Sequence, residues 1–380
     1  METSLIFGLG TSGLFLGRQL AKNNINVIGI GRIDDIGLYS KYIKGYVAET
    51  VDDINNIIED ICIKTETKPK AYISSDQYLT KILYEIPELF DKLDVIGADK
   101  EVLKLINNKE DIIIFCEKNG ILTPKLYKYD EIMEGKKNIE FPLIFKLNYK
   151  QLNIIKNPIG KIKIINNRIE LENIKRNIYN SNINKDNIVI QSYISGSNAS
   201  QFSFGGYFKK GKELSGIVVN QIRQYPQGVS SLVIETDNKN IEKKIKQKAN
   251  CLAKSFKYTG FMEIEFKVRD DKIYLLDINP RPWGWVSILG IKYKNFHHVF
   301  NHKKDKNISK NTNLVMWKSP IRELIGYSKN SQNVRDLKNI YREKYSKKDI
   351  AYDIYTRDDI KPLFAVLKVA MRKTINKLFK

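Results

Sequence analysis

The sequence has 380 residues, of which 42% are hydrophobic, and carries a formal net charge of +21 at pH 7. Its length and apolar content predict a folded protein of two or three domains and exclude a disordered chain. The lysines are spread along the chain instead of forming one basic stripe, which argues against a dedicated nucleic-acid surface. The three cysteines, Cys62, Cys116 and Cys251, lie far apart, so we expect reduced, buried side chains and neither disulfides nor a zinc site.

The first hundred residues predict a parallel α/β sheet. A strand at residues 4–8, a turn with GxGxxG spacing at residues 8–13 and a second strand at residues 26–30 form a βαβ unit. This pattern is typical of a dinucleotide site, but Gly31 and Arg32 stand where the acidic residue that binds the ribose is expected. The sequence shows neither a signal peptide nor an apolar run of membrane-spanning length, which predicts a cytoplasmic protein.

Several later positions combine polar residues with apolar patterns. Ser-Ser-Asp at residues 74–76 follows a predicted strand and either contacts a substrate or caps a helix, which is the more common use of these residues. Lys109 lies in a helical pattern at residues 99–119, and Lys146 ends an apolar strand that starts at residue 141. A lysine in a buried strand needs a polar partner.

A hairpin with one acidic face follows a basic amphipathic helix at residues 241–256. Residues 260–266 and 273–281 are rich in β-branched and aromatic residues, and the polar residues 269–272 form the turn between them. Side chains alternate between the two faces of a strand. The side chains expected on the polar face are Glu263, Glu265, Asp277 and Asn279. Those expected on the apolar face are Ile264, Phe266, Leu276 and Ile278.

The polar face of this hairpin predicts a metal site. Carboxylates that share a site raise one another's pKa unless a positive charge compensates them, and their oxygens suit Mg²⁺ or Mn²⁺. Arg281 follows directly and is able to bind a phosphoryl or carboxylate group through two parallel hydrogen bonds. A hairpin whose polar face is only solvated explains the same spacing.

The hairpin motif, Glu265 followed by Asp-Ile-Asn-Pro-Arg at residues 277–281, resembles the metal-binding signature of the ATP-grasp superfamily. With Arg-Gln-Tyr-Pro at residues 223–226 and Asn-Pro-Arg-Pro-Trp-Gly-Trp at residues 279–285, it is most similar to the carboxylate–amine ligase-like branch related to D-aspartate ligase. The resemblance covers about residues 1–290.

The resemblance implies an α/β and α+β fold in four segments. These are a Rossmann-like pre-ATP-grasp domain at 1–99, a first ATP-grasp subdomain or lid at 100–190, a second subdomain with the metal site at 191–300, and a basic, partly helical C-terminal extension at 301–380. The sequence departs from the family in the loop at residues 147–163, which contains Gly160 as its only glycine.

The resemblance also assigns roles to single residues around ATP and Mg²⁺ (or Mn²⁺). The metal ligands would be Glu265, Asp277 and Asn279. The phosphates would be bound by Lys109 and Lys146. The adenosine would be bound near Gln191, Tyr193, Ile194 and Asn198, where Gln191 and Asn198 replace residues that are often acidic in the family. The transferring group would be stabilised by Arg281 and Arg223, although Arg223 stands beside Pro226 and Gly228, which also suit an ordinary turn.

These roles imply an ADP-forming carboxylate–amine ligase, acting on a small carboxylate and an amine such as an amino acid. The carboxylate attacks the γ-phosphorus of ATP, and the amine then captures the acyl phosphate. Two alternatives remain: a nicotinamide-dependent oxidoreductase that uses the N-terminal GxGxxG, and a non-catalytic ATP-binding scaffold or sensor at the membrane surface.

The C-terminal part of the sequence is compatible with several partners. His298 and His302 have helical i,i+4 spacing, but the sequence around them gives little support for a zinc site. The last helix, within residues 361–380, has an apolar stripe flanked by lysine and arginine. The stripe consists of Leu363, Phe364, Leu367, Ala370, Met371, Ile375 and Leu378. Such a helix allows peripheral contact with the inner membrane face, whereas docking on the protein's own core, or in a homodimer, is the favoured interpretation.

Overall fold

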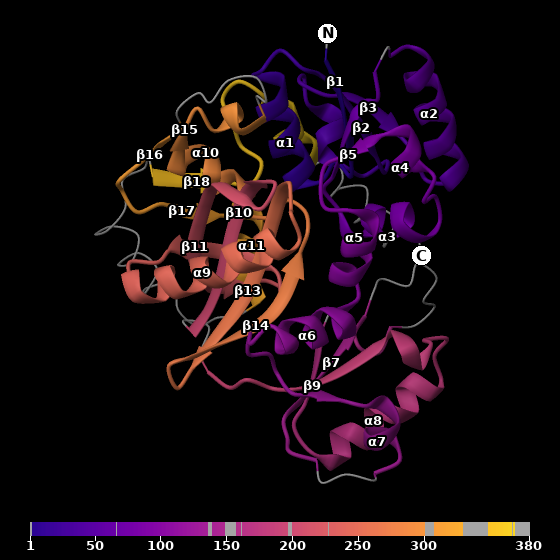
Figure 1. Ribbon diagram of the computed structural model, residues 1–380, viewed down its shortest axis with the longest axis vertical. Coiled ribbons are helices and arrows are strands. Elements are labelled where there is room, and N and C mark those ends of the chain that lie inside the picture. The colour runs from indigo at the N-terminus through magenta and orange to yellow at the C-terminus, as the bar shows by residue number, and fades with distance from the viewer. Residues whose placement is uncertain are drawn as a thin grey trace.

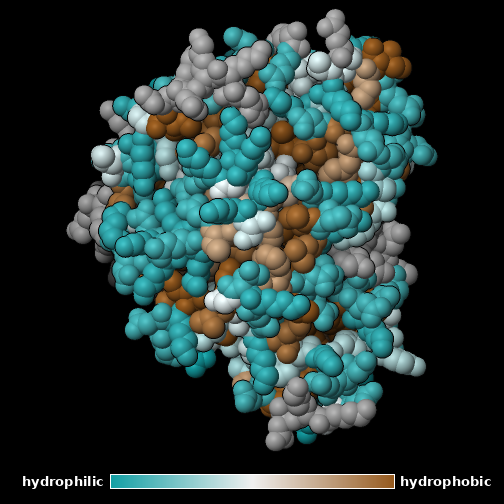
Figure 2. All heavy atoms as spheres, in the orientation of Figure 1, coloured by the Kyte–Doolittle hydropathy of each residue, from teal (hydrophilic) through white to brown (hydrophobic). Residues whose placement is uncertain are grey.

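The computed structural model describes residues 2–65, 67–135, 139–148, 157–160, 162–196, 200–226, 228–300, 308–329, 349–366 and 368. It is a mixed α/β fold in three parts, each built around its own sheet (Figure 1). None of the helices in these residues has the length and apolar character needed to span a bilayer. Figure 2 shows a face covered mostly by hydrophilic residues, with the hydrophobic ones in separate patches.

The first part is a parallel sheet with the strand order β3-β2-β1-β4-β5, as in a Rossmann-like domain. Its strands are β1 (Thr3–Phe7), β2 (Asn26–Gly31), β3 (Lys44–Val47), β4 (Lys70–Ile73) and β5 (Asp94–Val95). Its helices are α1 (Thr11–Ala21), η1 (Ile36–Tyr39), α2 (Val51–Ile63), α3 (Asp76–Tyr84) and α4 (Leu89–Lys92). The predicted βαβ unit is confirmed, because β1 and β2 pair in parallel on either side of α1 in the sequence.

The glycine-rich turn between β1 and α1 is tight and closed on the protein itself. Gly8 has a φ of +91°, and a Cβ atom on Gly13 would lie 2.1 Å from the carbonyl oxygen of Gly8. The backbone N–H of Leu9 donates to Asp35 (3.0 Å), and the hydroxyl of Ser74 donates to the Gly8 carbonyl. The glycines are therefore needed for the close packing of β1, α1 and the residues after β4.

The second part is a four-stranded antiparallel sheet with the order β6-β9-β7-β8. Its strands are β6 (Leu126–Tyr127), β7 (Leu143–Leu147), β8 (Ile162–Ile165) and β9 (Ile188–Ser192). Its helices are α7 (Tyr129–Met133), α8 (Arg168–Tyr179) and η2 (Lys185–Asn187). It has a hydrophobic core of its own, which includes Phe145, Ile174 and Ile190.

Two short helices, α5 (Lys100–Asn107) and α6 (Lys109–Lys118), connect the first part to the second. The prediction of one continuous helix at residues 99–119 is wrong. The side chain of Asn108 accepts hydrogen bonds from the backbone N–H groups of Glu110 and Asp111 and so begins a new helix. This break places Lys109 at the first position of α6.

The third part is a seven-stranded sheet with the order β14-β13-β10-β11-β12-β17-β18. Its strands are β10 (Gln201–Lys209), β11 (Lys212–Gln224), β12 (Ser230–Glu235), β13 (Gly260–Arg269), β14 (Lys272–Asn279), β17 (Met316–Lys318) and β18 (Ile350–Tyr352). The surrounding elements are α9 (Lys239–Ser255), η4 (Val286–Ile288), α10 (Leu289–Lys292), β15 (Tyr293–Lys294), η5 (Phe296–Phe300), β16 (Ser309–Lys310) and α11 (Pro320–Lys329).

The two faces of this large sheet pack against different parts of the chain. One face, with Ile264 and Phe266, shares a core with Leu252 of α9. The opposite face, with Tyr207 and Trp317, belongs to the hydrophobic core that contains α1. The sheet is therefore covered on one side by its own helix, in a core that continues through α5 into the first part, and on the other side by the core that contains α1.

The described C-terminal residues are built into this arrangement. β17 and β18 extend the sheet that carries the acidic hairpin. Arg18 of α1 forms a buried ion pair with Asp359 (2.9 Å) and also donates to the carbonyl of Ile354 (2.8 Å). Of the predicted apolar stripe, Leu363 packs partly against the core, while Phe364 is 60% exposed; the other stripe residues lie outside the described residues.

The cysteines differ from the expectation of uniform burial. Cys116 on α6 is buried, as predicted, and burial raises its pKa to about 12. Cys62 is only half-buried, and Cys251 is exposed at the surface of α9. The prediction of three buried thiols is therefore wrong for two of them, because the cysteine at position 251 lies on the solvent side of its helix.

Candidate active site

The acidic hairpin has the predicted register. Glu263 is the cross-strand neighbour of Asn279, and Glu265 is that of Asp277, so the four polar side chains share one face. Ile264, Phe266 and Ile278 point to the apolar core, as expected. Leu276 does not, because the register shifts after Glu265 and brings Leu275 opposite Phe266 instead.

Lys109 contacts the hairpin directly. Its ammonium group lies 2.8 Å from each carboxylate oxygen of Asp277. Burial lowers the pKa of Lys109, but the carboxylates of Asp277, Asp76 and Glu265 outweigh burial and hold the pKa above its ordinary value. The backbone N–H of the same lysine donates to the buried side chain of Asn148, a residue that the sequence analysis did not identify.

Lys146 approaches the same strand from the second part of the protein. It lies on β7, its residue is 8% exposed, and its ammonium group donates to the carbonyl oxygen of Leu276 (3.3 Å). The register shift that moves Leu276 out of the core is a β-bulge. The backbone carbonyl of Leu276 at this bulge accepts the hydrogen bond from Lys146. Lys109 and Lys146, which belong to different elements, converge on two consecutive residues of β14.

Glu263 and Trp285 orient the predicted ligand Asn279. One oxygen of Glu263 accepts a hydrogen bond from the indole N–H of Trp285 (2.8 Å), and the other accepts from the amide nitrogen of Asn279 (3.1 Å). The amide oxygen of Asn279 then accepts from Arg281 (3.3 Å). Both oxygens of the buried Glu263 thus accept hydrogen bonds, which hold Trp285 and Asn279 in place.

Arg281 is held by an acidic residue from the first part of the chain. Its Nε and Nη2 atoms both donate to the carboxylate of Asp76, with 2.8 Å for the Nη2 bond. Ser75 caps α3 through a bond from the N–H of Gln77, so the preferred capping interpretation is confirmed for Ser75, whereas Asp76 reaches the hairpin. Burial lowers the pKa of Arg281, but Asp76 and the hairpin carboxylates outweigh it and raise the pKa.

Arg223 lies apart from this cluster. It is on β11, which is separated from β13 by β10. Its guanidinium group forms an ion pair with the buried Glu323 of α11, including a bond of 3.1 Å from Nε. The structure therefore shows Arg223 in a contact between the sheet and α11, and not among the groups around Asp277.

The residues expected to bind the adenosine surround the end of β9. Gln191 is 1% exposed and is the cross-strand neighbour of Ile144, so it shares a sheet face with Lys146 two positions further along β7. The N–H of Tyr193 donates to the carbonyl of Pro142 (3.1 Å), which leaves the carbonyl groups of Tyr193 and Ile194 as candidate base contacts. Asn198 lies outside the described residues.

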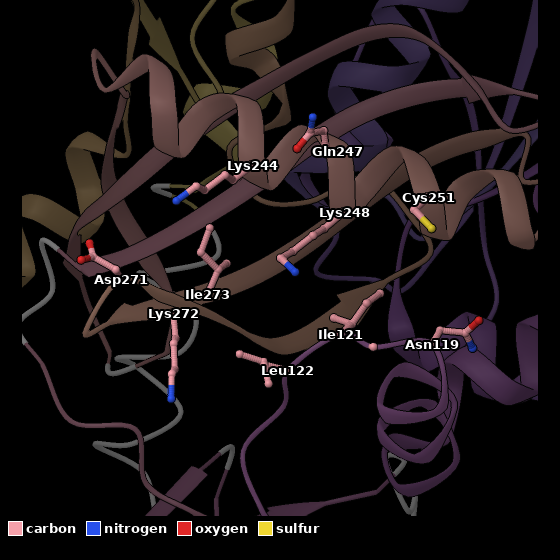
Figure 3. Close-up of a pocket in the computed structure, with 11 residues that line it drawn as sticks. Asn119, Ile121, Leu122, Lys244, Gln247, Lys248, Cys251, Asp271, Lys272 and Ile273 are labelled. Atoms are coloured by element: carbon pink, nitrogen blue, oxygen red, sulfur yellow. The ribbon is translucent and has the colours of Figure 1, made fainter.

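A separate groove lies on the other side of the hairpin. This groove of about 530 Å³ lies between α9 and the linker before β6 (Figure 3). Lys244 and Lys248 of α9 face Leu122 and Ile273 across it. Ile273 belongs to the apolar core face of the hairpin, so this groove is separate from the carboxylates.

The described ranges, the hairpin included, contain no group of three or more His, Cys, Asp and Glu side chains that could hold a metal ion. His298 is described but His302 is not, so the predicted i,i+4 pair lies partly outside these ranges. The hairpin offers two carboxylates and one amide oxygen, from Glu265, Asp277 and Asn279.

Comparison with known proteins identifies the fold. No family model and no curated protein matches the sequence. The N5-carboxyaminoimidazole ribonucleotide synthetase from Thermus thermophilus is similar, with a TM-score of 0.64 and 12% identity over 82% of this chain and 81% of that one. The biotin carboxylase domain of the Hydrogenobacter thermophilus 2-oxoglutarate carboxylase, crystallised with MgADP, has a TM-score of 0.64 and 14% identity over 83% and 73%.

A third solved structure is also similar. The L-amino acid ligase from Bacillus licheniformis has a TM-score of 0.57 and 13% identity, over 78% of this chain and 72% of that one. At sequence identities this low, the structural similarity establishes the fold and leaves the activity open. The chain has an ATP-grasp fold that follows a Rossmann-like domain.

Proposed function

We propose that this protein is an ATP-dependent, ADP-forming carboxylate–amine ligase of the branch related to D-aspartate ligase. The observation that carries this proposal is the convergence of Lys109 and Lys146 on Asp277 and Leu276, beside the paired Glu265. Two lysines next to clustered carboxylates form a site for a metal ion together with phosphate groups. A hairpin that was only solvated would not need a lysine from each of two other elements.

The donor set fits Mg²⁺ or Mn²⁺ bound with a nucleotide. Such ions need oxygen ligands, and Mg²⁺ is commonly held by one or two carboxylates while phosphates complete its coordination. Glu265 and Asp277 supply the carboxylates, and the fixed amide of Asn279 turns its oxygen toward Arg281. In this structure Lys109 and Arg281 donate to the oxygens of Asp277 and Asn279, so positive charge is already favoured at both positions.

The residues of the chain would act mainly by positioning and by neutralising charge. A metal ion held by Glu265, Asp277 and Asn279 would reduce the negative charge of the phosphate groups. Lys109 and Lys146 would bind phosphate oxygens. Arg281, fixed by Asp76, would stabilise the charge that develops as the γ-phosphoryl group moves to the substrate carboxylate. Attack of the amine on the acyl phosphate would then release inorganic phosphate and form the C–N bond.

The three larger sheets suggest a division of the chain, although β9 crosses residue 190 and β17 and β18 add residues beyond 300 to the third sheet. We propose a Rossmann-like domain at 1–99, a lid at 100–190 and a second subdomain at 191–300, with Gln191, Tyr193, Ile194 and Asn198 at the adenosine. Residues 301–380 would form a C-terminal segment of a cytoplasmic protein. The contact of Arg18 with Asp359 supports docking on the protein itself, and peripheral membrane contact would be limited to residues beyond it.

The oxidoreductase alternative has less support. The N–H of Leu9 in the glycine-rich turn already donates to Asp35, and Gly8 already accepts from Ser74. A scaffold without catalysis would bind ATP but release no ADP with any substrate pair.

The test is a screen of amino acids in pairs for ADP release, with Asp277→Ala as the comparison. We expect activity in the wild type and a loss of about 10³-fold or more in the variant. Unchanged turnover of Asp277→Ala would overturn the assignment of the metal site. MgATP binding without ADP release for all pairs would support the scaffold, and binding of NAD(H) without ATP would support the oxidoreductase.

A further inference from the structure

A second arginine lies beside the loop that follows Arg281. Nη1 of Arg322, on α11, donates to the carbonyl oxygen of Ser230 (3.0 Å), and the same nitrogen is 3.8 Å from the place that a Cβ atom of Gly284 would occupy. Arg322 is partly buried, and within the described ranges its other guanidinium N–H groups have no hydrogen-bond partner. Burial lowers the pKa of Arg322, and the carboxylate of Asp353 opposes this effect from a distance. A guanidinium group has five N–H donors, so most of its capacity to bind an anion is unused.

The loop at residues 280–285 connects the two arginines across the sheet. A Cβ atom on Gly205 of β10 would lie 2.1 Å from the ring of Trp283, so the loop passes directly over β10. Gly284 is only partly buried and lies on the side of Arg322. The loop therefore forms a wall that begins at Arg281 and ends near Arg322.

A row of polar side chains runs along the same face of the sheet, and its two central members, Ser203 and Gln221, are buried. Ser203 of β10 is the cross-strand neighbour of Glu265. Gln221 of β11 donates to the hydroxyl of Ser203 (2.9 Å) and accepts from the hydroxyl of Ser230 (2.6 Å). Ser230, the first residue of β12, binds Arg322 through its carbonyl. The row spans three strand spacings, about 14 Å, from the metal hairpin to Arg322.

We propose that Arg322 binds the carboxylate of the amine substrate, which would make that substrate an amino acid or another amine with a carboxylate. This inference rests on the proposed ligase function. Arg281 would act at the reacting end of the row and Arg322 at its far end, while the buried Ser203 and Gln221, which bond to each other, would fix the strands beneath them. A span of about 14 Å accommodates an acyl phosphate followed by an amino acid. Arg322 would then select for the acceptor without taking part in phosphoryl transfer.

Two variants separate substrate binding from a purely structural role. Arg322→Lys keeps a positive charge and a donor for Ser230 but removes the planar fork that matches a carboxylate. Arg322→Gln removes the charge as well. Arg176→Gln is the matched control, because Arg176 is exposed on α8, where its side chain donates to Asn173.

The experiment compares free amino acids with the corresponding amino-acid amides, which keep the amine and lose the carboxylate. Binding to the MgADP-loaded protein is measured by thermal shift and calorimetry, and the KM of the amine is measured for each pair that releases ADP. We expect wild type and Arg176→Gln to bind amino acids at least about tenfold more tightly than the amides. Arg322→Gln should lose this preference, while its MgADP affinity and its kcat change little.

Each outcome bears on the proposal separately from the ligase assignment. An unchanged preference for the free amino acid in Arg322→Gln overturns it, as does a wild type that binds no amino acid of the panel. If Arg322 had only a structural role, Arg322→Gln would lower the unfolding temperature and weaken the binding of amino acids and of their amides equally. Failure of MgADP to bind the wild type would instead count against the ligase function. The binding of amino acids and of their amides could then still be compared on the protein without nucleotide.

Discussion

The ammonium group of Lys109 lies 2.8 Å from both carboxylate oxygens of Asp277, although 168 residues separate the two positions. A positive charge thus sits where the proposed metal ion would bind the same carboxylate. Metal and lysine compete for Asp277, and phosphate groups are the natural alternative partner of the displaced lysine. The proposed site should therefore bind metal and nucleotide together more readily than metal alone.

Lys109→Met should change two affinities in opposite directions. Once the ammonium group is removed, a divalent ion no longer competes with Lys109 for the carboxylate of Asp277, so we expect Mn²⁺ alone to bind several-fold more tightly. ATP should bind about 10- to 100-fold more weakly, because a charged hydrogen bond to phosphate is lost. Mn²⁺ titration followed by electron paramagnetic resonance, and ATP calorimetry, measure the two effects. Lys118→Met, at the exposed end of the same helix, is the control, and parallel changes in both affinities would contradict the competition.

Asp76→Asn should lower catalysis more than binding. Asp76 holds the guanidinium group of Arg281 through two hydrogen bonds, and a misplaced arginine should reduce kcat by about 10²-fold. The MgATP affinity should stay within a few-fold of the wild-type value, since Lys109 and Lys146 are retained. Steady-state kinetics with Asp60→Asn, an exposed carboxylate on α2, as the control would check this. A wild-type kcat in Asp76→Asn would show that Arg281 needs no such partner.

Arg18→Met should destabilise the whole protein. Arg18 and Asp359 have side chains that are 8% and 1% exposed, and removal of one partner leaves a buried charge uncompensated, at a cost of about 3–5 kcal/mol. The exposed pair of Arg32 and Glu49 serves for comparison, because Arg32→Met should cost less than about 1 kcal/mol. Urea unfolding gives both values, and equal effects of the two substitutions would contradict the structural role of the buried pair.

The cysteines should react in a fixed order with iodoacetamide at pH 8. Cys251 is exposed and should react first. Burial raises the pKa of the half-buried Cys62, so less reactive thiolate is present there and its labelling should be slower. Cys116, with a pKa of about 12, should react only when the protein unfolds. Mass spectrometry of peptides over time gives the order, and early labelling of Cys116 would contradict its placement in the core.

Local sequence patterns predicted the hairpin well. The alternation of Glu263, Glu265, Asp277 and Asn279 follows from strand geometry alone, and so does their common face. The bulge at Leu276 was not foreseen, because a one-residue register shift leaves the hydrophobic pattern almost unchanged when Leu275 is equally apolar. The break between α5 and α6 was missed for a similar reason, since Asn108 interrupts a pattern whose apolar positions continue on both sides.

Contacts between distant segments were the part that the sequence could not predict. Asp76 reaches Arg281 over 205 positions, and Arg223 meets Glu323 over 100. The resemblance made Arg223 a candidate site residue, but only the packing of α11 on the sheet reveals its contact with Glu323. The tasks assigned to Lys146, Gln191 and Asn198 came from the resemblance and remain predictions.

The pairing of Arg18 with Asp359 also bears on how the protein is made. Ribosomes add about 5–20 residues per second, so the arginine emerges roughly 20 to 70 seconds before the aspartate that neutralises it. During that interval the newly made N-terminal domain has an unpaired guanidinium group where the finished protein has a closed contact. A truncated mRNA would yield chains that lack Asp359 and therefore this ion pair. Cellular proteases would remove such chains in preference to the full-length protein.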